Sequence, residues 1–479
     1  MSELDYGDIQ GTILRGYRVD RARHLVLRVR DAAAARAVLG SLVDGTEGRP
    51  QVTTAAPWAT KPESFLNLGI TAAGLAALGV PPETLAGFPG PFLRGATADT
   101  TTALVGDVGP SHPAHWVEGL ADGSRVHVIL SLWATGPARV IDEVTDVLRS
   151  AFTGAFEELT ALDANALPGN QVHFGYRDNI AQPRVEGAPP GKRLLRDPQP
   201  VVPAGAFLMG HANQYGGTYS VQPDELSTNS SFAAFRLLEQ DVAGFERFLE
   251  QSSTTAGIDA ETLAAKVCGR WRNGMPLVLS PDGPTPELPP DRLNDFDYVS
   301  ADATADDTFG YRCPVGSHIR RTNPRSQRVV GGGGALHRII RRAMPYGPPF
   351  DPGSADDHER GLVGWFINAD IGNQFEFLMS QWVNTDTFVM SVSGPAGANP
   401  AKNVSGHDLL AGATDAGSSS FTLSSPATSE AGWANTTLTG FPGFVTTRGG
   451  AYGYLPSITA IRYLAALPGS GPDPSASTS

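Results

Sequence analysis

Residues 125–152 carry the sequence "RVHVILSLWATGPARVIDEVTDVLRSAF", in which an alternating apolar run precedes apolar positions at helical spacing. Alternation with a period of two is typical of a β-strand, and recurrence every three to four residues is typical of an amphipathic helix. The stretch therefore predicts a strand followed by a helix.

The same pattern of a strand and then a helix recurs on both sides of this stretch. On the N-terminal side, "HLVLRVR" (24–30) precedes the alanine-rich "DAAAARAVLGSLV" (31–43), where Asp31 is a suitable helix cap. On the C-terminal side, "SFAAFRLLEQ" (231–240) precedes "DVAGFERFLEQ" (241–251). Farther on, "GFVTTRGGAYGYLP" (443–456) is expected to form paired strands.

Two rounds of this pattern predict an α+β fold made of two ferredoxin-like domains, each an antiparallel sheet with peripheral helices. We place the N-terminal domain at residues 1–200 and the C-terminal domain at residues 201–467. The end of the chain, residues 468–479, is rich in glycine, proline and serine and is expected to be a disordered tail.

Composition narrows the possible functions. The chain has 479 residues, of which 41% are hydrophobic and 18% charged, as in globular proteins. A net charge of −13 argues against nucleic acid and against an anionic membrane surface as partners. No apolar stretch approaches the roughly 20 residues of a membrane span. The start, "MSELDYGDIQ", carries acids where a secretory signal carries basic residues, so a cytoplasmic protein is expected.

Several kinds of site are excluded by motif. Only Cys268 and Cys313 are present, which excludes a disulfide scaffold and a cysteine-rich metal site. Without a CxxCH motif, any haem would not be attached as in c-type cytochromes. The chain also has no P-loop, no GxSxG and no HExxH.

The stretch "CPVGSHIRRTNPR" (313–325) combines a histidine with several arginines. His318 lies close in sequence to Arg320, Arg321 and Arg325. A neutral imidazole beside guanidinium groups suits a ligand that has a metal ion and carboxylate arms. Haem is such a ligand.

Further motifs lie along most of the chain, from about residue 8 to about residue 467. They are "DIQGTILRGY", "HFGYRDN", "FLMGHANQYGG", "HRIIRRAMPYG", "NADIGNQFEF" and "FVTTRGGAYGYLPSITAIRYLA". Together with "CPVGSHIRRTNPR", these motifs resemble those of the DyP-type (dye-decolorizing) haem peroxidases.

The resemblance implies two ferredoxin-like domains with haem b between them, and an enzyme that uses hydrogen peroxide to oxidise bulky aromatic or dye-like donors. It implies that His318 is the proximal iron ligand and that Asp178 lies on the distal face. The distal arginine is placed at Arg341, with Arg342 as the alternative. Other residues expected to border the cofactor are Asn179, Ile180, Arg320, Trp365 and Ile367.

The distal roles also follow from chemistry. Peroxide cleavage needs a group that accepts a proton and returns it to the departing oxygen, and Asp178 can do this. The departing oxygen gains negative charge, which the guanidinium of Arg341 stabilises. The family motif GxxDG ends here in Asn179, and asparagine tolerates left-handed backbone geometry. The Asn179 amide is expected to hydrogen-bond Asp178 or to narrow the access of peroxide.

Several points stay open at this stage. A proximal imidazole usually donates its second N–H to a carboxylate or a carbonyl, and Glu376 and Asp370 are the candidates. The alternative functions are an oxidative tailoring enzyme for one metabolite and a non-catalytic haem-binding protein. The oligomeric state and the physiological electron donor are not indicated by the sequence.

Overall fold

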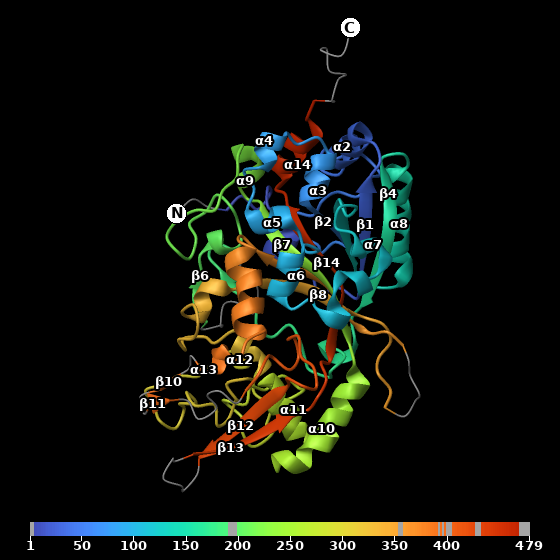
Figure 1. Cartoon of the computed structure of the whole chain (residues 1–479). Helices are drawn as coiled ribbons and strands as arrows, with labels where there is room; N and C mark the ends of the chain where they lie inside the picture. The colour runs from blue at the N-terminus through green and yellow to red at the C-terminus, as the bar shows by residue number, and fades with distance from the viewer. Residues whose placement is uncertain are drawn as a thin grey trace.

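The computed structural model describes residues 4–189, 199–352, 358–390, 393–394, 397–398, 405–426 and 433–468. Its centre is an eight-stranded sheet with the strand order β4-β1-β3-β2-β14-β7-β9-β8 (Figure 1). Every neighbouring pair in this sheet is antiparallel. The strands are β1 (Arg21–Val29), β2 (Ser64–Ile70), β3 (Val128–Ala134), β4 (Phe156–Asn165), β7 (Ser231–Gln240), β8 (Ile340–Tyr346), β9 (Gly361–Asn368) and β14 (Val445–Leu455).

Each half of this sheet has the ferredoxin-like strand order. The halves are β4-β1-β3-β2 and β14-β7-β9-β8, and in both the fourth strand lies beside the first, followed by the third and the second. A helical segment follows the first and third strands of each half, which is the βαββαβ plan. The α+β, ferredoxin-like prediction is confirmed. The helical segments are α2 (Ala32–Ser41), α8 (Ala138–Phe152), α10 (Val242–Ala256) and the π-helical η6 (Gly372–Glu376) and η7 (Leu378–Val383).

The two halves share one sheet, whereas the sequence suggested a separate sheet for each domain. Strand β2 pairs with β14 through Ile70 and Tyr454. The indole of Trp365 packs across this junction, since a Cβ atom on Gly69 or Gly453 would lie 2.6 or 2.7 Å from its ring. Pairing the two halves protects two strand edges that would otherwise be exposed.

The expected pair of strands at residues 443–456 is wrong, because β14 runs through as one strand. A register shift between Thr447 and Gly449 bends the strand without reversing it. A Cβ atom on Gly449 would lie 2.3 Å from Leu120, so this glycine allows close packing and does not form a turn.

The capping residue expected from the sequence is found at α2. The Asp31 carboxylate accepts a hydrogen bond of 2.7 Å from the Ala34 N–H, as expected for the cap of α2. Between β2 and β3 the chain forms the short helices α3 (Ala72–Ala77), α4 (Pro82–Leu85), α5 (Gly90–Arg94), α6 (Asp99–Val105) and α7 (Glu118–Ala121).

Helices and a hairpin lie beyond the end of the sheet, at the bottom of Figure 1. They are α11 (Ala260–Cys268), α12 (His318–Thr322) and the hairpin of β12 (Ser420–Pro426) with β13 (Trp433–Thr439). The expected disordered tail lies outside the described residues from position 469 onward. Within the described part of the chain, the helices are too short or too polar to cross a bilayer.

Candidate functional site

His318 is the first residue of the short helix α12, and its ring is held by a carboxylate. Its Nδ1 lies 3.1 Å from Oδ2 of Asp408, whose side chain is 0% exposed, while the His318 side chain is 26% exposed. Asp408 also accepts hydrogen bonds from the N–H groups of Leu410 and Ala411. A carboxylate acceptor favours the tautomer with the proton on Nδ1, which leaves the lone pair of Nε2 available.

The electrostatics of Asp408 support this arrangement. Burial acts to raise the pKa of Asp408, but the neighbouring His318, Arg321 and the Leu410 N–H outweigh it and hold the pKa below its usual value. The carboxylate therefore stays ionised over a wide pH range. An ionised acceptor makes the imidazole a stronger donor to a metal ion.

Neither sequence candidate for the histidine partner is correct. Glu376 instead accepts hydrogen bonds from Arg94 and from the hydroxyl of Tyr452. Asp370 accepts from the backbone and side chain of Asn373. Asp408 belongs to "GHDLLAG" (406–412), and no local sequence pattern connects it with His318.

Arg320 lies in the protein interior, and its predicted contact with a cofactor stays a prediction. It is fully buried, and its guanidinium bonds to Asp307, to the carbonyls of Cys313 and Thr308, and to Gln327. The neighbouring Arg321 is also buried and donates to backbone carbonyls, among them those of Trp382 and Thr385. With their donors used inside the protein, both arginines hold loops around α12 in place.

Asp178 and Arg341 come together from segments far apart in the chain. Arg341 Nη2 lies 3.8 Å from Asp178 Oδ1, and the two side chains are 40% and 49% exposed. The same Nη2 donates to the carbonyl of Ala181 at 3.0 Å. The Asp178 loop is itself anchored, because the Asp178 N–H donates to the Asn170 carbonyl.

Arg342, the alternative, points away from Asp178. It donates to the carbonyls of Thr12, Ile13 and Arg15 at the end of α1 (Gly11–Leu14). Burial lowers its pKa to about 10. Its place next to Arg341 on β8 explains the difference, because successive side chains of a strand point to opposite faces.

The same alternation places the predicted apolar walls, Trp365 and Ile367, relative to Arg341, while their predicted contact with a cofactor stays a prediction. Phe366 pairs with Arg341, and Trp365 pairs with Arg342. Directly paired residues of antiparallel strands share a face, so Trp365 and Ile367 lie on the face opposite to Arg341. Trp365 donates to the Ser131 hydroxyl at 2.8 Å inside the core. Phe366 is the residue of β9 that shares the face of Arg341.

The two residues after Asp178 differ in their surroundings. Asn179 has φ = 58°, the left-handed geometry that a glycine at this position would also allow. Ile180 packs on the backbone of Gly274, where a Cβ atom would lie 2.4 Å from its Cδ1, and belongs to the cluster around Trp271. Their predicted contact with a cofactor stays a prediction.

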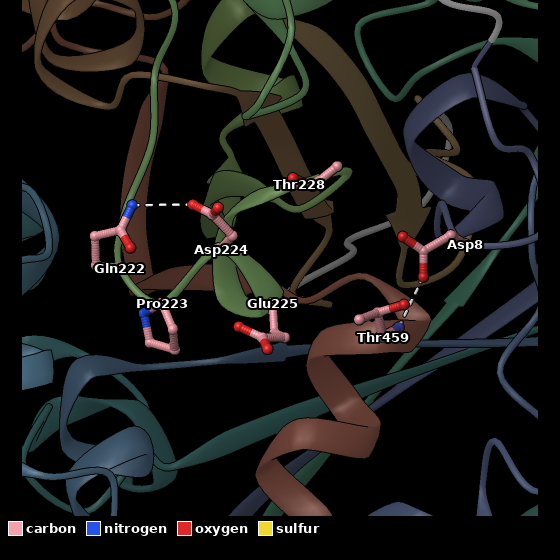
Figure 2. Close-up of a pocket in the computed structure, with 7 residues that line it drawn as sticks. All are labelled: Asp8, Gln222, Pro223, Asp224, Glu225, Thr228 and Thr459. Carbon is pink, nitrogen blue, oxygen red and sulfur yellow. Dashed lines mark hydrogen bonds between the residues drawn. The ribbon is translucent and has the colours of Figure 1, made fainter.

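A surface cavity elsewhere contains none of these residues (Figure 2). The Asp8 carboxylate there accepts a hydrogen bond of 2.7 Å from the Thr459 N–H, and Gln222 donates to Asp224 at 2.9 Å. These contacts join the N-terminal segment to α14 (Ile458–Ala465) and brace the loop before α9 (Asp224–Ser227). The cavity is lined by Asp8, Gln222, Pro223, Asp224, Glu225, Thr228 and Thr459.

Comparison with known proteins gives the family. No protein-family model matches the chain. Dye-decolorizing peroxidase msp1 of Mycetinis scorodonius is 30% identical over 480 residues, which is 96% of this chain and 87% of the relative. The chain belongs to the dye-decolorizing peroxidase family. As such it is a haem-dependent peroxidase, and the family expected from the sequence motifs is confirmed.

Solved dye-decolorizing peroxidases also share the fold. A fungal DyP-type peroxidase from Auricularia auricula-judae has a TM-score of 0.78 and 28% identity, and covers 97% of this chain and 100% of its own. A dye-decolorizing peroxidase in complex with 2,6-dimethoxyphenol has a TM-score of 0.78 and 29% identity, with the same coverage.

The residues at His318 fit a haem. Within the described part of the chain, the hydrogen-bond partner of its ring is Asp408 at Nδ1, and Nε2 has none. A ring fixed at one nitrogen with the other nitrogen open is the arrangement that proximal haem ligands require.

Proposed function

We propose that this dye-decolorizing peroxidase holds haem b through His318 and reacts with hydrogen peroxide through Asp178 and Arg341. The proposal rests first on the pairing of His318 with Asp408, whose buried carboxylate lies 3.1 Å from Nδ1. It rests second on the convergence of Asp178 and Arg341 from separate segments. The absence of a CxxCH motif favours haem b over a covalently attached haem.

The residues would divide the chemistry as follows. When bound, the haem supplies the iron that takes up the oxidising equivalents of peroxide and passes them to a donor in one-electron steps. The Asp178 carboxylate accepts a proton from peroxide and returns it to the departing oxygen. The guanidinium of Arg341 stabilises the negative charge that develops there. Asp408 keeps the imidazole of His318 in one orientation and tautomer.

The donor is proposed to be a bulky aromatic compound. The relative from Mycetinis scorodonius is named for dye decolorization, and one solved structure contains 2,6-dimethoxyphenol. Turnover of an anthraquinone dye and of 2,6-dimethoxyphenol with hydrogen peroxide tests this class. Turnover of one small metabolite, with none of these donors accepted, would instead favour a tailoring enzyme.

The role of His318 is tested by haem content and spectrum. His318→Ala is expected to lose most of its haem, or to retain a haem whose Soret band responds to added imidazole. The exposed His115 provides the control, and His115→Ala is expected to retain the wild-type spectrum. A His318→Ala protein with normal haem content and an unchanged Soret band would refute the assignment. A pyridine haemochrome spectrum of the wild type tests for haem b.

We also propose that the protein acts in the cytoplasm. Cys268 and Cys313 are both buried free thiols, as is usual in reducing compartments. Cell fractionation with an activity assay tests this location, and activity in the culture medium of intact cells would contradict it.

A further inference from the structure

Gln182 contacts the backbone of the proposed distal arginine at two points. The Arg341 N–H donates to Gln182 Oε1, and Gln182 Nε2 donates to the Arg341 carbonyl, both at 3.2 Å. Strand β8 is the last in the strand order, so at one of its edges no strand of the described residues forms a hydrogen-bonded ladder with it. Outward N–H and C=O groups of an edge strand need other partners. The carboxamide of Gln182 takes the place of a strand at Arg341.

The same loop also contacts the side chain of this arginine. The Ala181 carbonyl accepts from Arg341 Nη2 at 3.0 Å, so consecutive loop residues hold the guanidinium and the backbone of one arginine. Pro183 follows directly and is buried. A residue before proline is restricted to extended geometry, which limits the conformations open to Gln182.

We infer that Gln182 is a positioning residue for peroxide cleavage, which it serves by fixing Arg341 relative to Asp178. The inference rests on the proposed function of Arg341. Arg341 lies 3.8 Å from Asp178, and both side chains are partly exposed. Because few contacts fix these two side chains, the distance between them depends on how the loop is held to β8. Gln182 and the Ala181 carbonyl form that attachment.

Most of the expected effect of replacing Gln182 comes from the loss of its contact with the Arg341 N–H. The Arg341 carbonyl also accepts from Arg342 Nη1 at 3.1 Å, so it keeps a donor when Gln182 is replaced. The Arg341 N–H then loses the acceptor that Gln182 provides. Leucine has a volume close to that of glutamine but no polar group. Gln182→Leu is therefore expected to let β8 and the loop shift relative to each other at Arg341.

The test is a double-mutant cycle on the haem-loaded enzyme. Gln182→Leu is expected to slow the bimolecular reaction with hydrogen peroxide about tenfold, the scale of a small misplacement of a reacting group. In an Arg341→Leu background the same change is expected to have no further effect, because the residue that it positions is gone. A purely structural role would slow both backgrounds equally, and that result would overturn the inference.

A second readout does not depend on turnover. Fluoride binds ferric haem as an anion, and a correctly placed guanidinium stabilises it. Gln182→Leu is expected to weaken fluoride binding about tenfold, again only when Arg341 is present. Gln214→Leu is the control, since Gln214 donates to the Leu336 carbonyl just before β8 and does not contact Arg341. This control is expected to match the wild type in both measurements.

The outcomes separate this inference from the proposed function. If Arg341→Leu reacts with peroxide as fast as the wild type, the proposed role of Arg341 fails. If Arg341→Leu is slow but Gln182→Leu is not, only the inference about Gln182 fails. If the Gln182→Leu protein does not bind haem, Gln182→Ala replaces it in the cycle. The smaller alanine side chain leaves room for water at the Arg341 N–H, and the expected effects on the peroxide reaction and on fluoride binding are the same.

Discussion

His318 and Asp408 are 90 residues apart in the chain, yet Nδ1 of the imidazole lies 3.1 Å from the buried carboxylate. Such a carboxylate fixes the ring and increases its basicity, and replacing partners of this kind usually costs about 10- to 100-fold in metal affinity or activity. The pair links α12 to the 405–413 segment, so the sheet itself contributes neither residue.

Replacing Asp408 should change the haem rather than the overall fold. In Asp408→Ala the imidazole loses a negatively charged acceptor, donates less charge to iron and stabilises the ferric state less. We expect a more positive reduction potential, measured by a spectroelectrochemical titration. Asp370→Ala serves as the control, because the Asp370 carboxylate accepts from Asn373 in its own turn and forms no hydrogen bond with His318 in the described part of the chain. Equal potentials for both variants would contradict the assigned role of Asp408.

Arg341 is expected to contribute more than Asp178 to peroxide cleavage. The guanidinium keeps its charge at every physiological pH, while Asp178 has to take up and release a proton in each cycle. Stopped-flow measurement of the peroxide reaction in Arg341→Leu and Asp178→Ala gives the ranking. A larger loss in the aspartate variant would reverse it.

Arg320 should matter for stability. Its partner Asp307 is 1% exposed, and burial raises the pKa of Asp307 despite the nearby guanidinium. In Arg320→Met this carboxylate loses its ion pair, and breaking a buried pair typically costs about 3–5 kcal/mol of unfolding free energy. The more exposed pair of Arg149 and Glu158 gives a matched control, for which Arg149→Met should cost less than about 1 kcal/mol. Denaturant unfolding measures both losses of unfolding free energy. Similar losses would show that the buried Arg320–Asp307 pair contributes no more to stability than the exposed pair.

Period-two and helical patterns were sufficient to predict the fold class. The alternation in "RVHVILSLWA" becomes β3 and the apolar spacing of the following residues becomes α8, because local patterning governs both elements. The sharing of one sheet by both halves could not be predicted in this way, since β2 and β14 come from distant segments and pair at Ile70 and Tyr454.

The sequence motifs predicted site residues where each motif lies on one continuous segment. They placed the distal arginine at Arg341, with Arg342 as the alternative, and Arg341 is the one that lies near Asp178. The motifs did not show which residues of β9 share the face of Arg341, because a shift of one residue moves a strand side chain to the other face, and Phe366 is the residue that pairs with Arg341. The long-range partner Asp408 could not be found, since no local pattern encodes a contact across 90 residues.

His24 should make the protein sensitive to acid. Its ring is fully buried next to the Ser131 hydroxyl, and burial lowers the pKa of His24 from 6.5 to about 3, although Asp163 opposes this shift. Between pH 6.5 and 3 the unfolded chain binds a proton at His24 that the folded protein does not. Stability is therefore present above pH 6.5 and is lost as the pH falls toward 3.

His24→Gln removes this titration and keeps a polar partner for Ser131. We expect the unfolding free energy of the variant to fall less steeply than that of the wild type between pH 6 and pH 4. The two slopes should differ by about 1.4 kcal/mol per pH unit, the value for one proton. Denaturant unfolding at several pH values measures this slope. Parallel curves for the two proteins would mean that His24 does not cause the acid sensitivity.

Asn179 is the residue at which the chain departs from the GxxDG motif, and its backbone has φ = 58°. Left-handed geometry is accessible to glycine without penalty and to asparagine at small cost, whereas for alanine it costs about 1–2 kcal/mol. Asn179→Gly should therefore keep the loop and remove the side chain next to Asp178. We expect a faster reaction with peroxide and little change in haem affinity.

Asn179→Ala distinguishes the effect of the Asn179 side chain from the effect of its backbone geometry. It also removes the amide, but it strains the loop, so the reaction with peroxide should not reach the rate of Asn179→Gly and thermal stability should fall. Stopped-flow rates over a range of pH, together with thermal unfolding, give both quantities. If the glycine variant and the wild type have superimposable rate profiles, Asn179 only satisfies the turn and does not limit the access of peroxide.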